Sequence, residues 1–203
     1  MEDLSFTTFI KLGLLPTTQG RIGQIQRMLS SERGYDFYKQ MKFAAKEVAL
    51  GKISPASIID KLKLIPRASE RDHNVLMAEN FLDWWAGQTG AVAIPDRPAG
   101  TYRTTTMQFG IKMRPELAFD KDGVRHVVYL WATKTPKISN QAAGSGLFLL
   151  QKQLKKGKFA DAKFSILNLR NKKLLSDDLI TNQSSAIALA EISQLNEIWK
   201  NII

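Results

Sequence analysis

The sequence predicts an α/β protein of the α+β kind, in which a small central mixed sheet is flanked by helices and preceded by an N-terminal helical extension. The first 66 residues show only the hydrophobic spacing of helices, and strand-like alternation begins near Tyr102. A turn signature, an apolar strand, a helix, a strand and a helix then follow in that order. We therefore expect a helical region over residues 1–66 and an α/β core with a C-terminal helix over residues 67–203.

The N-terminal region is expected to consist of helices alone. A short amphipathic segment covers about residues 4–14, and a longer pattern covers about 20–49 with a break near Gly34. Ser54 and Pro55 then supply an N-cap and a first helical residue for a further helix. The side chains expected to face inward are Ile22, Ile25, Met28, Leu29, Tyr38, Met41, Ala45, Ile58, Ile59, Leu62 and Leu64.

The elements of the core follow from changes in this spacing. A helix fits residues 69–85, and from Tyr102 onward apolar and polar residues alternate as in a half-exposed strand, either one long strand or a bent pair. Residues 120–123 form a turn signature before a strand over 124–134, whose apolar centre indicates burial on both faces. The remaining predicted elements are a helix at about 140–155, a strand at 163–169 and a helix at about 184–203. The last helix is expected to bury Ile187, Leu189, Ile192, Leu195, Ile198 and Trp199.

The composition excludes several classes of chemistry. The chain has no cysteine, so disulfides, thiolate nucleophiles and cysteine-ligated metals are excluded. Its two histidines, His73 and His126, are far apart in the sequence, and any metal would have to be held by carboxylates. No apolar run reaches the roughly 18 residues of a membrane span, and the first residues are acidic where a signal peptide is basic. We expect a cytoplasmic protein without a membrane partner.

The positive charge is concentrated in the second half of the chain. The net charge is +10, and residues 101–203 carry 16 Lys and Arg against 8 Asp and Glu. Ten basic residues and one acid, Asp161, lie between Lys134 and Lys173. Such an excess favours a polyanionic partner, and DNA or RNA is the natural one. The alternative is a lysine-rich face that only keeps the protein in solution.

Two short motifs carry the candidate chemistry. Pro115-Glu116 precedes the predicted turn, and Ala132-Thr133-Lys134 ends the strand that follows it. In this order of elements, they resemble the PD-(D/E)xK superfamily, which has the restriction-endonuclease-like fold, over about residues 69–170. The resemblance implies a nuclease-like core in which two carboxylates hold Mg²⁺ or Mn²⁺ and a lysine assists the attacking water.

The second acid of the family pattern is missing, because Ala132 stands in its place. Glu116 alone would hold a metal weakly, so hydrolysis should be lost unless another acid moves in. Glu79 or Asp83 on the preceding helix could supply that acid, and Glu79, Glu116 and Lys134 would then be the catalytic residues. Without it, no cofactor is expected.

Three functions remain open at this stage. The first is a nucleic-acid-binding protein with an inactive nuclease-like core, and the resemblance implies a place in a mobile-element, repair or phage-defence system. The second is an active metal-dependent nuclease with a rearranged site. The third is an interaction or assembly module that binds protein through the N-terminal helices and Trp84-Trp85. The predicted phosphate contacts are Arg114, Lys134, Lys137, Lys152, Lys155, Lys156 and Lys158.

Overall fold

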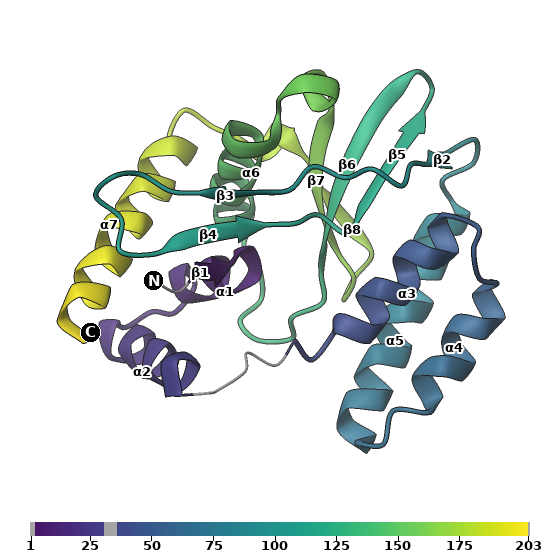
Figure 1. Ribbon diagram of the computed structural model, residues 1–203, viewed down its shortest axis with the longest axis horizontal. Helices are drawn as coiled ribbons and strands as arrows, with labels where there is room; N and C mark the ends of the chain where they lie inside the picture. The colour runs from purple at the N-terminus through teal and green to yellow at the C-terminus, as the bar shows by residue number, and fades with distance from the viewer. Residues whose placement is uncertain (1–2, 31–35, 203) are drawn as a thin grey trace.

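The computed structural model describes residues 3–30 and 36–202, and in these ranges the chain forms two mixed sheets flanked by helices (Figure 1). The predicted fold class, a mixed sheet flanked by helices, is confirmed. The break expected near Gly34 lies outside the described residues. No helix in the described ranges is both long enough and apolar enough to cross a bilayer.

The larger sheet has five strands in the order β2-β5-β6-β7-β8. Its central pair, β6 and β7, is parallel, and the other pairs are antiparallel. The strands are β2 (Val92–Ala93), β5 (Leu117–Lys121), β6 (Val124–Trp131), β7 (Lys163–Asn168) and β8 (Lys173–Leu175). The predicted turn between β5 and β6 is confirmed: Asp122 and Gly123 have φ values of 52° and 74°, and a two-residue type I′ hairpin needs positive φ at both positions.

A smaller sheet of three strands has the order β1-β4-β3 and differs from the sequence prediction. Its strands are β1 (Asp3–Ser5), β3 (Gly100–Tyr102) and β4 (Gly110–Met113). The long strand or bent pair predicted from Tyr102 onward is divided into three strands, β3, β4 and β5, and β5 belongs to the larger sheet. The helix expected from residue 4 begins only at Phe6, because Asp3 and its neighbours pair with β4 instead. Three-residue strands are too short to show a period.

Seven α-helices surround these sheets in the described ranges: α1 (Phe6–Gly13), α2 (Thr18–Ser30), α3 (Lys39–Ala49), α4 (Pro55–Lys63), α5 (Ala68–Ala86), α6 (Asn140–Leu154) and α7 (Ser184–Ile202). Two short 3₁₀ turns, η1 (Gly157–Phe159) and η2 (Asp177–Leu179), complete the connections. The predicted start of α4 is confirmed, since the Ser54 hydroxyl accepts a hydrogen bond from the Ser57 amide and Pro55 is the first helical residue. Serines also cap α1 and α6.

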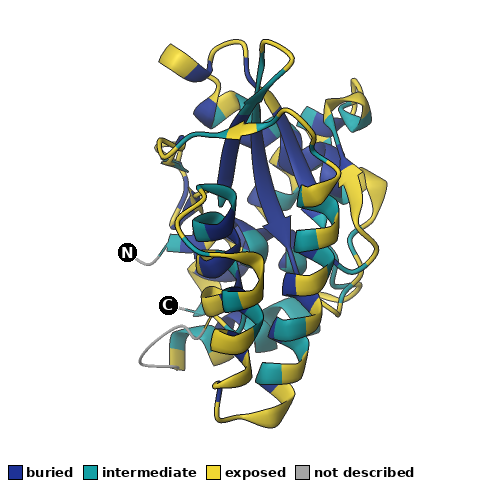
Figure 2. Ribbon diagram, turned by 90° about the vertical axis from the view of Figure 1, so that its right-hand side faces the viewer, coloured by how far each residue is buried: buried dark blue, intermediate teal, exposed yellow. Residues whose placement is uncertain are grey.

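The five-stranded sheet separates two hydrophobic cores, and its buried strands run through the middle of the molecule in Figure 2. Val127, Tyr129 and Trp131 of β6 face the first core, which α1, α2, α6, α7 and the smaller sheet cover. Val128 and Leu130 face the second core, under α3, α4 and α5. Alternate side chains of a strand point to opposite faces, so burial on both sides explains the continuous apolar run of β6.

Two apolar residues expected to face inward are exposed. Leu189 of α7 is 45% exposed, because the buried stripe of this helix runs through Ala188, Ile192 and Leu195 and passes it by. Leu64 is 79% exposed at the C-cap of α4, one residue beyond the helix. Both departures lie next to correctly predicted elements.

Candidate nuclease-like centre and basic surfaces

Glu116 lies immediately before β5, at the end of the larger sheet where β6 and β7 finish. The Leu130 amide of β6 donates a hydrogen bond to Glu116 Oε2 (2.8 Å). The register pairs Leu117 with Val128, so one further step along it puts Glu116 opposite Tyr129. The carboxylate is therefore held against the last residues of β6.

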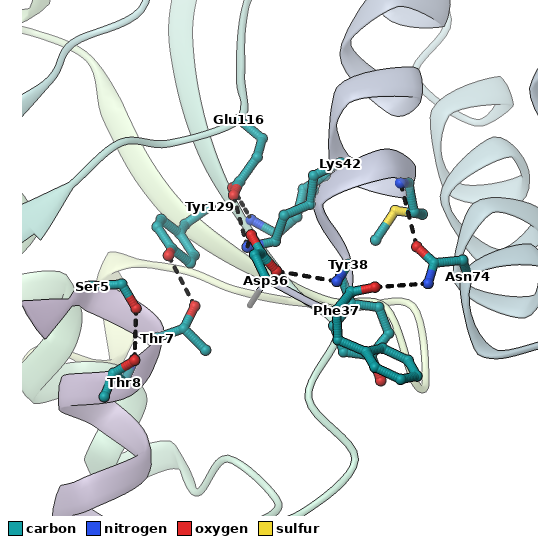
Figure 3. Close-up of polar contacts among 12 residues, drawn as sticks. Ser5, Thr7, Thr8, Asp36, Phe37, Tyr38, Lys42, Asn74, Glu116 and Tyr129 are labelled. Atoms are coloured by element: carbon teal, nitrogen blue, oxygen red, sulfur yellow. Dashed lines mark hydrogen bonds and ion pairs between the residues drawn. The ribbon is translucent and has the colours of Figure 1, made fainter. Parts of the chain in front are cut away.

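The partner of this carboxylate is a lysine from a distant helix. Lys42 of α3 reaches the sheet end, and its Nζ lies 3.0 Å from Glu116 Oε1 (Figure 3). The same Nζ lies 3.9 Å from Asp36 Oδ2 and 5.4 Å from the centre of the Tyr129 ring. Both members of the Lys42–Glu116 pair are buried, with 13% and 12% of their side chains exposed. An ammonium group thus stands where the carboxylate oxygens converge.

The protonation of Lys42 follows from its surroundings. Burial acts to lower its pKa, but the charge of Glu116, with smaller effects of Tyr129 and Asp36, outweighs burial and raises the pKa above the ordinary lysine value. The side chain therefore carries a full positive charge at neutral pH. This charge cancels that of Glu116, the carboxylate nearest to it.

Tyr129 is the residue of β6 that the register puts opposite Glu116. Its ring is buried against Phe6, with the ring centres 4.7 Å apart, and its hydroxyl shares a hydrogen bond with Thr7 Oγ1 (2.9 Å). Burial raises the pKa of this phenol, so it stays neutral. A neutral, hydrogen-bonded phenol is a poor ligand for a divalent cation, which prefers carboxylate and carbonyl oxygens.

The second motif, residues 132–134, lies beyond the end of β6. Ala132 is buried in the second core, on the opposite face of the sheet from Tyr129. Lys134 is exposed. The residue opposite Glu116 in the register is Tyr129, and Ala132 lies three residues further along the chain.

The two acids considered as replacements for the missing metal ligand lie in other surroundings. Glu79 is exposed on α5, one residue before Asn80, whose side-chain amide donates to the Leu169 carbonyl (2.8 Å). Asp83 pairs with Lys172 Nζ at 3.2 Å. Within residues 3–30 and 36–202, no group of three or more acidic or histidine side chains is placed to hold a metal ion. Glu116 already has a cationic partner in Lys42, and the second carboxylate near that ammonium is Asp36 at 3.9 Å.

Nine of the ten basic residues between 134 and 173, together with Arg114, form two surfaces near opposite ends of α6, and Lys163 at the start of β7 is in neither. A helix of 15 residues is about 22 Å long, and α6 separates Lys134 and Lys137 before it from Lys155 and Lys156 after it. We call the first the sheet-end surface: Arg114, Lys134, Lys137, Arg170, Lys172 and Lys173. We call the second the helix-end surface: Lys152, Lys155, Lys156 and Lys158.

Trp84 and Trp85, considered above as a binding surface, contribute to packing. Both rings contact Phe119 of β5, at centre distances of 6.2 Å and 5.4 Å, and both contact Phe81. They lie half-buried at the edge of the second core. Contacts within the protein therefore cover a large part of the surface of each ring.

Sequence reasoning missed Lys42 and Tyr129, the two side chains that surround Glu116. Lys42 follows the buried Met41 in an ordinary amphipathic helix, and nothing in the spacing singles it out. Tyr129 belongs to an apolar run and resembles any core residue of a strand.

No protein-family model matches this chain, and no curated protein matches it.

Proposed function

We propose that this protein binds nucleic acid and does not cleave it, because its nuclease-like core has lost the means to hold a catalytic metal. The observation that carries the proposal is the buried pair between Lys42 and Glu116, 3.0 Å apart, at the end of the larger sheet. An ammonium in this position excludes a divalent cation, since both would need the same carboxylate oxygens.

The arrangement around this pair supports the same conclusion. A magnesium ion in a phosphoryl-transfer site usually has one or two carboxylate ligands together with phosphate oxygens and water. Glu116 would have to exchange Lys42 for the metal, Tyr129 offers no negative charge, and the other nearby carboxylate, Asp36, also faces the Lys42 ammonium at 3.9 Å. Hydrolysis needs the metal to lower the pKa of water and to neutralise charge on the phosphate.

Binding is supported by the charge left at the surface. The chain carries +10 overall, and the cations around the sheet end include several exposed lysines. A protein that neutralises several phosphates releases their counterions, so the affinity should fall steeply with salt. Such a protein binds a phosphodiester backbone and leaves it intact.

The test combines binding and cleavage in one set of samples. Purified protein is titrated into labelled single- and double-stranded DNA and RNA at two salt concentrations, with and without Mn²⁺. We expect salt-sensitive binding and uncut strands in every sample. Cleavage that requires Mn²⁺ and disappears in both Glu116→Ala and Lys134→Ala would contradict the proposal and support an active nuclease. Absence of binding to all four substrates would rule out a nucleic-acid partner of these kinds.

A further inference from the structure

The two basic surfaces differ in how their charges are used within the protein. We propose that the sheet-end surface is the one that contacts the phosphodiester backbone, and that the helix-end surface does not. This inference rests on the proposed function and assigns it to one end of the larger sheet. The argument depends on the register of the strands, the partners of each cation and the contacts that hold the two basic segments together.

The register of the sheet brings the sheet-end residues together from three separate segments. Lys173 pairs with Asn168, and Asn168 pairs with Trp131, so the three residues form a row across the first position of β8 and the last positions of β7 and β6. Lys134 and Lys137 follow Trp131 in the connection to α6. Arg114 joins them because it precedes β5, which is antiparallel to β6 and begins at the same end.

A single arginine fixes the two main basic segments relative to each other. Arg170, in the turn between β7 and β8, donates from Nε to the Ala132 carbonyl (3.3 Å) and from its terminal nitrogen to the Tyr38 hydroxyl (3.0 Å). The turn that carries Lys173 is thereby bonded to the connection that carries Lys134. Cations on segments held in place lose less conformational freedom when they meet a phosphate.

Most cations of the sheet-end surface have no charged partner within the described part of the protein. In the described part of the chain, the charged groups of Arg114, Lys134, Lys137 and Lys173 form no ion pair or side-chain hydrogen bond, and all four residues are exposed. Lys172 is paired with Asp83. These four cations therefore keep their full capacity to bind an external anion.

The acids at the same end are mostly neutralised. Lys42 pairs with Glu116 and approaches Asp36, and Lys172 pairs with Asp83. Glu79 is the exposed acid that remains on α5. Because Lys42 neutralises the negative charge of Glu116, this carboxylate does not repel a phosphate that approaches the surrounding lysines.

The helix-end surface has internal uses for its charges. Lys158 pairs with Asp96, and Lys152 lies 5.6 Å from the ring centres of both Tyr102 and Phe148. Lysines at the C-terminus of α6 also interact favourably with the helix dipole. Exposed acids lie nearby, for example Asp161. Contacts within the protein thus account for Lys152 and Lys158, whereas Lys155 and Lys156 are exposed at the C-terminal end of α6 and form no ion pair in the described ranges.

The experiment compares two triple variants with the same change in net charge. Lys134→Gln/Lys137→Gln/Lys173→Gln alters the sheet-end surface, and Lys152→Gln/Lys155→Gln/Lys156→Gln is the matched control at the helix end. Binding to a labelled DNA duplex is measured by fluorescence anisotropy over a range of salt, with single-stranded DNA and duplex RNA as further arms. Circular dichroism and the denaturation midpoint confirm that both variants fold.

We expect the sheet-end variant to lose at least about tenfold in affinity. The negative slope of log K against log salt should become shallower by about three, one for each phosphate contact removed. The control should lose less than about threefold, the small effect of a long-range charge change. Equal losses in the two variants, or a larger loss in the control, would overturn the assignment. If the unaltered protein binds none of the substrates, the proposed function fails, and this outcome is distinct from a wrong choice of surface.

Discussion

The Lys42–Glu116 pair yields the most direct prediction, which concerns stability. Lys42→Met keeps the length of the side chain and its apolar stem but removes the ammonium. Glu116 would then be a carboxylate with 12% of its side chain exposed and without its cationic partner. Breaking a buried ion pair on one side typically costs about 3–5 kcal/mol, because the remaining charge stays desolvated.

The expected loss lies at the lower end of this range. Glu116 keeps the hydrogen bond from the Leu130 amide, which continues to stabilise its charge. We therefore expect Lys42→Met to lower the free energy of unfolding by about 3 kcal/mol. The companion variant Glu116→Gln removes the opposite partner and should destabilise as well, because a buried ammonium is left with Asp36 at 3.9 Å.

The assay is urea unfolding followed by tryptophan fluorescence, which reports on Trp131 and Trp199 in the first core. The double variant Lys42→Met/Glu116→Gln removes both charges and should recover most of the stability lost by Lys42→Met, since two neutral side chains carry little desolvation cost. A loss below about 1 kcal/mol in Lys42→Met, a value typical of exposed pairs, would refute the reasoning. Simple addition of the two single losses in the double variant would refute it equally.

Three further predictions concern other parts of the molecule. Gly144→Ala should destabilise the protein by about 1–3 kcal/mol, because the added Cβ would lie 2.2 Å from the Leu179 carbonyl oxygen. Gly23→Ala, where no atom lies within 4 Å of the added Cβ, should stabilise α2 by about 0.5–1 kcal/mol. Thermal unfolding of the two variants measures both effects. Burial and neighbouring lysines lower the pKa of His126, so the unfolded chain takes up its proton first as pH falls; stability should rise from about pH 5 to 7, and His126→Gln should flatten that rise in urea titrations. Asn74→Ala should cost about 2 kcal/mol in the same assay, because this buried amide bonds the Met41 amide and two carbonyls, and an unchanged midpoint would show that water replaces it.

The sequence predicted best those elements whose residues carry a local signal. The hairpin at residues 120–123 was predictable because aspartate and glycine tolerate positive φ, and both central residues adopt it. The start of α4 was predictable for a similar reason, since Ser54 and Pro55 suit the first positions of a helix by their own chemistry. Neither element depends on a distant part of the chain.

Elements that depend on distant partners could not be predicted. β1 consists of three residues and becomes a strand because Asp3 pairs with Gly110, more than a hundred residues away. Gly110 itself is needed there, because a Cβ on it would lie 2.5 Å from Asp3 Oδ1. The spacing of residues from Tyr102 onward was therefore interpreted as one long strand or a bent pair, although the structure contains three strands there, in two sheets.

The candidate site shows the same division. Glu116 was singled out because Pro115-Glu116 resembles the first element of the family motif, and it lies at the end of the larger sheet. The motif put Ala132 in the place of the second acid, whereas the strand register puts Tyr129 opposite Glu116. The sequence alone does not show which residue of β6 lies opposite Glu116, and only the pairing of β5 with β6 identifies it. Lys42 comes from a separate helix, so no motif could include it.

The way the first helices divide between the two cores limits how this chain can be shortened. Phe6 and Leu12 of α1 fill the first core, whereas Met41 of α3 and Ile58 of α4 fill the second. A fragment that began at residue 67 would therefore lose cover on both faces of the larger sheet at once. Its bare strands would offer other copies two apolar surfaces to adhere to. Residues 1–66 are thus built into the body of the protein, and excising them would yield an aggregating product.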